Sequence, residues 1–429
     1  MNAADQPLRW TDARARALLR RMFDAAVSAA DPAKVLPQHL PPPPKGRCVV
    51  VGAGKAAGAM AAAVDACWPD APLTGAVVTP YGYGLPGGRI RVLEAAHPVP
   101  DANSEAAARE MLRLVEGLTP DDLVISLISG GGSSVMSLPA PGLTLTDKQA
   151  VSRALLASGL DIRTMNAIRR RLSGIKGGKL AAAAAPAPVV TLCISDIPGD
   201  DAAAIASGPT IPDPDAERDL GAFARQLRDH IPAAVYERLV APPQPVGAAG
   251  AADIRMVATP AACLAAAAAV AEAAGVEAEI LGDDLEGESR TLGLLMAACA
   301  RRPVSRPKVL LSGGETTVTL AGHKAGRGGR NTEFALSLAL ALQKTPGIWA
   351  LAADTDGEDG ANGGAAGAVI GPETLARAAD AGLDAREHLD GHDSGGFFAA
   401  LDDLLMTGPT FTNVNDFRAI LVTPQRPGA

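Results

Sequence analysis

Short apolar runs alternate with amphipathic stretches along most of the chain. A continuous apolar run of four to eight residues rich in Val, Ile and Leu is typical of a strand buried on both faces of a parallel sheet. Such runs predict strands at 47–51, 75–80, 123–128, 188–195, 254–258, 277–281, 308–312, 349–353 and 417–422. Apolar residues at helical spacing predict helices at 11–30, 104–118, 146–159, 260–274, 288–301 and 334–342. The alternation predicts an α/β fold.

The chain is long enough for two domains. Its 429 residues are 48% hydrophobic, so two cores can be built, largely from Ala, Val, Leu and Ile because aromatic residues are only 3%. The segment 242–252 is rich in Pro, Gly and Ala and is the predicted boundary, which gives domains 1–246 and 247–429. A β-α-β unit formed by 254–258, 260–274 and 277–281 is predicted to follow it.

The strand 123–128 runs directly into Ser129-Gly130-Gly131-Gly132-Ser133-Ser134. Adjacent glycines let a ligand approach the backbone and can direct successive N–H groups toward one point, which suits an anion. A flexible turn would explain a lone triple glycine, but the plan recurs where the strand 308–312 leads into Gly313-Gly314-Glu315. The two loops predict phosphate or substrate sites at Ser129, Gly130, Gly131, Gly132 and Ser133, and at Gly313, Gly314 and Glu315.

A third glycine turn contains Lys55. The sequence Gly52-Ala-Gly54-Lys55-Ala-Ala-Gly58 follows a predicted strand and opens a helix, as a dinucleotide fingerprint would. Its glycine spacing departs from G-x-G-x-x-G, and the next strand, 75–80, ends without the acidic residue that would bind a ribose hydroxyl. A lysine at a helix N-terminus is unfavourable unless an anion joins it, so Lys55 is a candidate functional residue.

Cations and carboxylates gather in a few other motifs. On a helix, Asn166, Arg169 and Arg170 would lie on one side, and Lys176 belongs to a further glycine turn. Arg330 stands in a glycine-flanked turn before a predicted helix. A solvated charged face and ordinary turn chemistry are the competing explanations. Carboxylates that follow predicted strands, Asp196 and Asp354, are candidates for a general base or a metal ligand.

Composition excludes several classes of function. The net charge of -8 argues against nucleic acid as a partner and against a basic membrane-binding patch. No window reaches the length of a membrane span, and no apolar leader is expected at the N-terminus. Five scattered cysteines without a C-x-x-C pair fit a reducing, cytoplasmic compartment.

Together these motifs resemble the glycerate 2-kinases of the MOFRL type, a family often labelled hydroxypyruvate reductase. The resemblance covers nearly the whole chain in a fixed order. It rests on residues 51–56, 97–101, 129–134, 166–169, 172–179, 195–201, 205–210, 312–316, 328–331, 354–357, 393–394 and 412–416. One departure is Thr332, where the family usually has Gln.

The resemblance implies a larger Rossmann-like α/β/α N-terminal domain, a smaller α/β C-terminal domain and an active site in the cleft between them. It implies that ATP phosphorylates D-glycerate to 2-phosphoglycerate with Mg²⁺ or another divalent cation. The family's proposed active-site lysine and arginine fall on Lys55 and Arg330. We further predict roles for Asp196 as base or metal ligand, for Asp354 as metal ligand, and for Asn166, Arg169 and Lys176 in binding the substrate or its phosphate.

Two other functions are kept as alternatives. One is an NAD(P)-dependent hydroxypyruvate reductase, against which the altered glycine spacing counts. The other is a non-enzymatic binding protein of two α/β lobes, which would explain the glycine loops but not the carboxylates at strand ends. Sequence leaves the oligomeric state open, a homodimer being one option.

Overall fold

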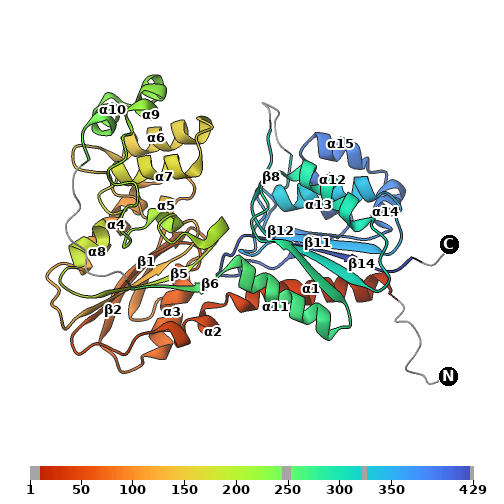
Figure 1. Cartoon of the computed structure of the whole chain (residues 1–429), viewed down its shortest axis with the longest axis horizontal. Coiled ribbons are helices and arrows are strands. Elements are labelled where there is room, and N and C mark those ends of the chain that lie inside the picture. Colours follow the sequence, from red (N-terminus) through yellow and green to blue (C-terminus); the bar gives the residue numbers. More distant parts are fainter. Residues whose placement is uncertain (1–9, 244–252, 321–325, 426–429) are drawn as a thin grey trace. The chain divides into compact units, whose positions relative to one another are not determined.

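The computed structural model describes residues 10–243, 253–320 and 326–425, which form two compact units (Figure 1). We name the first the parallel-sheet unit; it comprises Ala30–Thr259 and Phe411–Asn413. We name the second the mixed-sheet unit; it comprises Met1–Ala29, Pro260–Thr410 and Val414–Ala429. Each unit is described by itself.

The parallel-sheet unit is built on six parallel strands in the order β3-β2-β1-β4-β5-β6. This is the strand order of a Rossmann fold, so the predicted α/β class and the Rossmann-like sheet are confirmed. The order reverses between β1 and β4, which are neighbours although β2 and β3 separate them in sequence. The strands are β1 (Cys48–Ala53), β2 (Leu73–Pro80), β3 (Ile90–Ala95), β4 (Leu123–Ile128), β5 (Val189–Ile194) and β6 (Asp253–Ala258).

Burial explains why these segments form strands. Every residue of β1 and of β4 is buried, which matches their unbroken apolar sequences.

The α-helices of the unit are α2 (Pro32–Val35), α3 (Ala57–Cys67), α4 (Ala102–Leu114), α5 (Gly132–Val135), α6 (Leu145–Ala157), α7 (Ile162–Arg171), α8 (Lys179–Ala184), α9 (Gly221–Gln226) and α10 (Ala233–Val240). Short 3₁₀ helices are η1 (Pro37–His39), η2 (Pro198–Asp200), η3 (Ile205–Ser207) and η4 (Arg228–His230).

The mixed-sheet unit has six strands in the order β13-β12-β11-β14-β9-β7, and β7 and β9 are its parallel pair. They are β7 (Glu277–Gly282), β9 (Lys308–Ser312), β11 (Ile348–Asp354), β12 (Ala365–Ile370), β13 (Leu404–Met406) and β14 (Asp416–Val422), while β8 (Gly287–Glu288) pairs with β10 (Thr316–Thr317). The helices are α1 (Asp12–Ala29), α11 (Pro260–Ala273), α12 (Ser289–Ala300), α13 (Arg330–Leu342), α14 (Thr374–Asp380), α15 (Ala385–Asp390) and α16 (Ser394–Ala400). The phenylalanines of α13 and α16 lie in its core.

The units depart from the predicted boundary in α1, in β6 and in the segment Phe411–Asn413. The N-terminal helix α1 belongs to the mixed-sheet unit, where Phe23 packs edge-on against Phe417 of β14 with ring centroids 5.8 Å apart. The predicted β-α-β unit is wrong, because β6 pairs with β5 in the parallel sheet whereas β7 pairs with β9 in the other sheet. Periodicity identifies each element but not the sheet that it joins. Most of the predicted linker, residues 244–252, lies outside the described residues.

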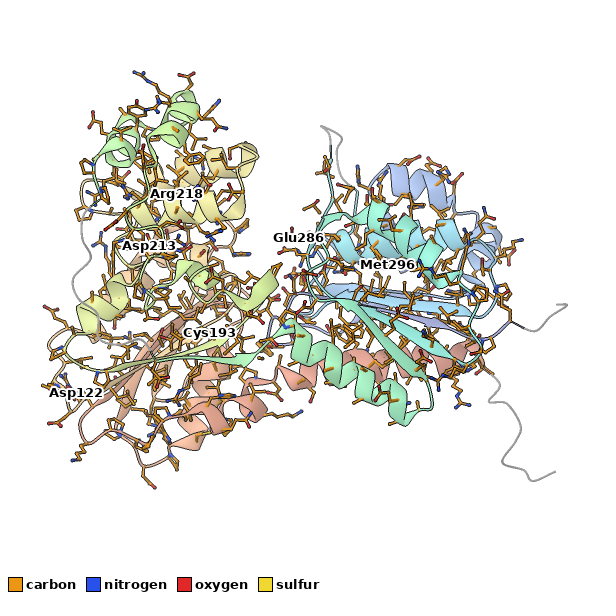
Figure 2. The ribbon with its side chains drawn as sticks, viewed as in Figure 1. Asp122, Cys193, Asp213, Arg218, Glu286 and Met296 are labelled. Carbon is orange, nitrogen blue, oxygen red and sulfur yellow. The ribbon has the colours of Figure 1, made fainter. Side chains whose placement is uncertain are left out.

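Two further observations concern the predicted cellular setting. Within the described residues, no helix is long and apolar enough to cross a membrane. All five cysteines are free thiols. Burial raises the pKa of Cys193, labelled on β5 in Figure 2, to about 12, so this thiol stays protonated and packs as a small apolar side chain.

Candidate active site

The carboxyl ends of β1 and β4 lie side by side and bring two of the glycine turns together. Ala53 at the end of β1 is in register with Ile128 at the end of β4. Beyond these residues, the N–H of Ser129 donates to the carbonyl of Ala53 at 3.1 Å, and the N–H of Lys55 donates to the carbonyl of Gly130 at 2.8 Å. Open α/β sheets bind ligands at such a reversal of strand order, so the sequence places its glycine turns where this fold is expected to use them.

Glycine is required where the two turns meet. Gly54 has a φ of +128°, and a Cβ there would lie 2.3 Å from the Ser129 Oγ. Gly131 has a φ of +78° and forms the N-cap of α5. A Cβ on Gly132 would lie 2.7 Å from the Ala206 Cβ and 2.9 Å from the Ala53 carbonyl oxygen. Side chains larger than hydrogen would therefore strain or separate this pair of turns.

Lys55 and His97 flank the triple glycine. A Cβ on Gly131 would lie 3.4 Å from the Lys55 Cγ and 3.7 Å from the His97 Cε1, so both side chains line the same turn. The His97 Nδ1 is 2.7 Å from the Ser134 Oγ, and that hydroxyl donates to the carbonyl of Gly131. His97 thus holds the far end of the glycine loop.

Asp196 reaches the same loop from the end of β5. Its Oδ2 accepts a hydrogen bond from the Asn413 side chain at 3.0 Å. A Cβ on Gly130 would lie 1.7 Å from that oxygen, which means that the carboxylate lies directly against the glycine backbone. Lys55, the loop 129–134 and Asp196, which sequence selected separately, are therefore brought together at one edge of the parallel sheet.

A buried cluster of cations lies behind the loop. The Lys176 ammonium donates to the carbonyl of Ser133 at 2.5 Å, and the side chain is 1% exposed. Burial lowers the pKa of Lys176 well below its usual value, and the charges of Lys148 and Arg169 lower it further. Arg169 in turn donates to the Asn166 side chain at 3.1 Å. Positive charge collected behind the loop would be stabilised by an anion bound on it.

Lys148 was missed by the sequence analysis. It lies on α6 and is 8% exposed, and burial, aided by Lys179 and Arg169, lowers its pKa to about 7. An isolated lysine on an amphipathic helix is usually solvated, so nothing local in the sequence distinguishes it.

Arg170 departs from the prediction that it shares a side of the helix with Asn166 and Arg169. Its guanidinium pairs with Asp213 and Asp215, both at 2.5 Å, and is buried there. The i, i+3 and i+4 spacing brings the backbones of Asn166, Arg169 and Arg170 close together. The long side chain of Arg170 nevertheless extends to Asp213 and Asp215, which lie 43 and 45 residues away in sequence.

Arg330 is the centre of a second group of residues, in the mixed-sheet unit. It is the first residue of α13, and its guanidinium pairs with Asp416 and Asp354, each at 2.8 Å, and with Glu315. Burial lowers its pKa, but the three carboxylates outweigh this and hold the pKa well above its usual value. Glu333, three residues after Arg330 on the same helix, pairs with Arg290 at 2.5 Å instead.

The second glycine loop is packed by backbone contacts. Gly314 has a φ of +98°, and a Cβ there would lie 2.2 Å from the backbone nitrogen of Leu285. The carbonyl of Gly313 accepts a hydrogen bond from Arg418 at 2.9 Å. The positive φ and the close backbone contact explain why residue 314 is glycine. Binding of a ligand by Gly313, Gly314 or Glu315 stays a prediction.

The predicted metal ligands are Asp196 and Asp354, whose carboxylates have different surroundings. Among the described residues, no cluster of three or more His, Cys, Asp or Glu side chains has the arrangement of a metal site. The Asp354 carboxylate already accepts from Arg330 through Oδ2 and from the Asp356 N–H through Oδ1. Mg²⁺ in phosphoryl-transfer enzymes is commonly held by one or two carboxylates plus substrate phosphates, and Asp196 beside the glycine loop fits that pattern better than Asp354.

Comparison with known proteins gives a consistent picture. Residues 18–240 match the family described as "Domain of unknown function (DUF4147)", and residues 308–416 match the MOFRL family. The chain is 36% identical to the D-glycerate 2-kinase of Thermotoga maritima over 402 residues, covering 91% of this chain and 94% of that one. It is 55% identical over 420 residues to a "Putative hydroxypyruvate reductase" of Agrobacterium vitis, covering 96% of each. Its fold is similar to the crystal structure of the Thermotoga maritima glycerate kinase, with a TM-score of 0.83 and 33% identity over 96% of this chain and 100% of that one.

Proposed function

Because this chain belongs to the family of glycerate 2-kinases that combine a DUF4147 and a MOFRL domain, we propose that it phosphorylates D-glycerate with ATP. The products are ADP and 2-phosphoglycerate. The observation that carries the proposal is the meeting of Lys55, the triple-glycine loop, the buried Lys176 and Asp196 at the strand reversal of the parallel sheet.

Phosphoryl transfer asks the protein mainly to position the reactants and to stabilise negative charge. The loop Ser129–Ser134 supplies glycine backbone that a phosphate can approach closely. Lys55 lines one side of the loop, and Lys176 donates a hydrogen bond to the carbonyl of Ser133 from behind it. In this proposal the loop holds a phosphate group and Lys55 stabilises the charge that develops on it.

In this proposal Asp196 accepts the proton of the substrate or binds the metal ion. Its carboxylate lies against Gly130 and is oriented by Asn413. As a base it would accept the proton of the glycerate 2-hydroxyl. As a ligand it would hold the divalent cation, which when bound would neutralise phosphate charge.

Arg330 needs an exchange of partners before it can bind a substrate. Two of its carboxylate partners, Asp354 and Asp416, are buried, whereas the Glu315 side chain is 53% exposed. An anionic group of the substrate can replace the exposed glutamate while the buried pairs keep the guanidinium in place. We propose that Glu315 occupies the substrate's position on Arg330 in the absence of ligand and that Arg330 contributes to the same reaction.

The reductase alternative is supported by the name of the Agrobacterium vitis relative, a "Putative hydroxypyruvate reductase". In a dinucleotide-binding Rossmann fold, an acidic residue at the end of the second strand binds the ribose. Here β2 ends at Thr79-Pro80, with Tyr81 next. The expected acid is absent from that position, which favours the kinase.

Two parallel assays discriminate the functions. The full chain with ATP and D-glycerate should release ADP in proportion to glycerate consumed, and with hydroxypyruvate it should leave the nicotinamide absorbance band of NADH and NADPH unchanged. Oxidation of either nicotinamide cofactor without ADP release from glycerate would overturn the proposal.

A further inference from the structure

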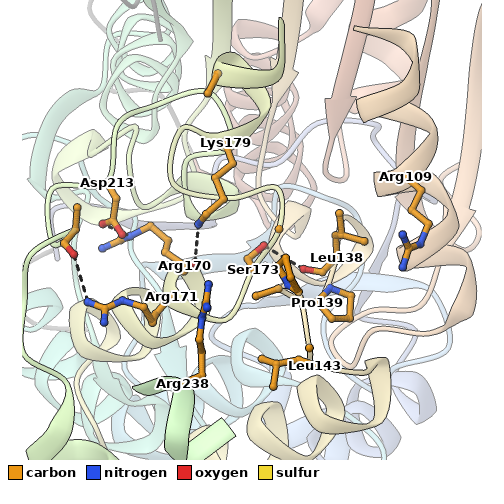
Figure 3. A pocket seen from close by; sticks show the side chains of 16 residues that line it. Arg109, Leu138, Pro139, Leu143, Arg170, Arg171, Ser173, Lys179, Asp213 and Arg238 are labelled. Atoms are coloured by element: carbon orange, nitrogen blue, oxygen red, sulfur yellow. Dashed lines mark hydrogen bonds and ion pairs between the residues drawn. The ribbon is translucent and has the colours of Figure 1, made fainter. Parts of the chain in front are cut away.

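A cationic cavity in the parallel-sheet unit is not used by the proposed reaction. Its volume is about 610 Å³, within the usual range for small-molecule sites, and the loop 129–134 does not line it. The walls come from α4, α7, α8, α10 and the segments 138–143 and 213–216 (Figure 3). The lining contains five cationic side chains and one carboxylate. The cationic residues are Arg109, Arg170, Arg171, Lys179 and Arg238.

The carboxylate does not balance these charges. Asp213 pairs with Arg170, and Asp215 pairs with the same guanidinium, so Arg170 is neutralised. Arg171 donates only to the backbone carbonyls of residues 216, 218 and 241. Arg109 pairs with Glu105, so the lining cations without an ion pair among the described residues are Arg171, Lys179 and Arg238.

The pKa of Lys179 is lowered by burial and by the neighbouring positive charges. Burial lowers its pKa to about 8, and Arg238, Arg171 and Arg170 lower it further while Asp213 opposes the change. The pKa of Arg171 is also lowered by burial; Asp213 and Asp219 oppose this change, and Arg238 adds to it. Mutual repulsion of this kind is relieved when an anion enters.

Arg238 provides an independent sign of a ligand. It projects from α10 toward Arg171 in Figure 3. Its Nε is buried and has no hydrogen-bond partner among the residues that the structure describes. A buried donor left unsatisfied costs about 1–3 kcal/mol, so the structure retains an unfavourable group that an acceptor in the cavity would satisfy.

We propose that this cavity is a second anion site, separate from the reaction site, which binds a small phosphorylated molecule. A phosphate group offers three acceptor oxygens and up to two charges, and arginine binds it with two parallel hydrogen bonds. A single carboxylate would leave most of the excess charge uncompensated. The volume exceeds that of inorganic phosphate alone, so a phosphate ester or a diphosphate fits best.

The test is isothermal titration calorimetry of the full chain with inorganic pyrophosphate. Arg238→Gln and Arg171→Gln should each weaken binding at least tenfold. Arg109→Gln is a third variant that should disturb folding least, because the one ion pair of Arg109 among the described residues is a surface contact with Glu105. Arg225→Gln removes an exposed arginine of α9 outside the cavity and is the matched control, which should bind as the wild type does.

A second set of titrations separates the cavity from the reaction site. In Lys55→Met the cavity binding should persist, and in Arg238→Gln the KM for ATP should stay within about twofold of wild type. Three results would overturn the proposal: no pyrophosphate binding by the wild type, equal binding by Arg238→Gln and Arg225→Gln, or loss of ATP affinity together with pyrophosphate binding. The last would make the cavity part of the nucleotide site. The binding measurements do not depend on glycerate phosphorylation, so either proposal can fail alone.

Discussion

Replacing Gly130 by alanine should displace Asp196 and leave the fold almost intact. The new Cβ would lie 1.7 Å from the Asp196 Oδ2, 2.4 Å from its Cγ and 2.5 Å from the Asn413 Nδ2. All of these atoms belong to side chains, so the carboxylate can rotate away while the backbone stays. Gly130 does not have a positive φ, so alanine adds no left-handed strain.

The magnitude follows from the contact that is lost. The hydrogen bond from Asn413 to Asp196 has a charged acceptor, and such bonds contribute about 1.5–3 kcal/mol. If Asp196 acts in the transition state, a loss of that free energy from transition-state stabilisation lowers kcat/KM roughly ten- to hundredfold. Because Asp196 is only partly buried, water can solvate the displaced carboxylate, and the free energy of unfolding should fall by less than about 1.5 kcal/mol.

Gly131→Ala is the matched control. Its Cβ would make ordinary contacts, the nearest at 3.4 Å to the Lys55 Cγ, but its φ of +78° is unfavourable for alanine by about 1–2 kcal/mol. This variant should lose more stability and less activity than Gly130→Ala. Urea unfolding curves and steady-state ADP release decide the comparison. Wild-type kcat/KM in Gly130→Ala, or activity losses that simply follow stability in both variants, would refute the role of Asp196.

Three other substitutions test the roles of Arg330 and Glu315 and the lowered pKa of Lys148. Arg330→Lys cannot pair with Asp354, Asp416 and Glu315 at once, so we expect both kcat and the urea midpoint to fall; normal kinetics would remove Arg330 from the reaction. Glu315→Gln should lower the KM for glycerate if Glu315 competes with substrate, whereas a higher KM would show that it binds substrate. The pKa of Lys148 is lowered from 10.5 to about 7 by burial and by neighbouring cations, so between these values the unfolded chain binds the extra proton and stability should rise with pH. Lys148→Met should flatten that rise in melting temperature and the exposed Lys45→Met should not; an unchanged profile in Lys148→Met would contradict the pKa shift.

The sequence predicted the elements that local pattern determines. Buried strands such as β1 and β4 have unbroken apolar sequences, and the glycines that follow them are dictated by close contacts between the two turns. Because parallel strands expose their carboxyl ends at one edge, the grouping of Lys55, the triple glycine and Asp196 follows from the strand assignment.

Long-range partners could not be predicted in this way. The carboxylates around Arg330 come from residues 315, 354 and 416, and no periodicity links them. The lowered pKa of Lys148 comes first from burial and then from the charges of Lys179 on α8 and Arg169 on α7, none of which its own helix reveals. For the same reason, the unit that α1 joins depends on contacts with distant residues such as Phe417, and the sheet that β6 joins depends on its pairing with β5.

The regiochemistry of the product tests the central claim most directly. Phosphorus NMR of the mixture formed from ATP and D-glycerate distinguishes phosphate on the 2-hydroxyl from phosphate on the 3-hydroxyl and detects ADP in the same spectrum. We expect 2-phosphoglycerate and ADP in equal amounts, with both signals reduced together in Gly130→Ala. A 3-phosphoglycerate signal, or ATP hydrolysis to inorganic phosphate without a glycerate ester, would contradict the claim.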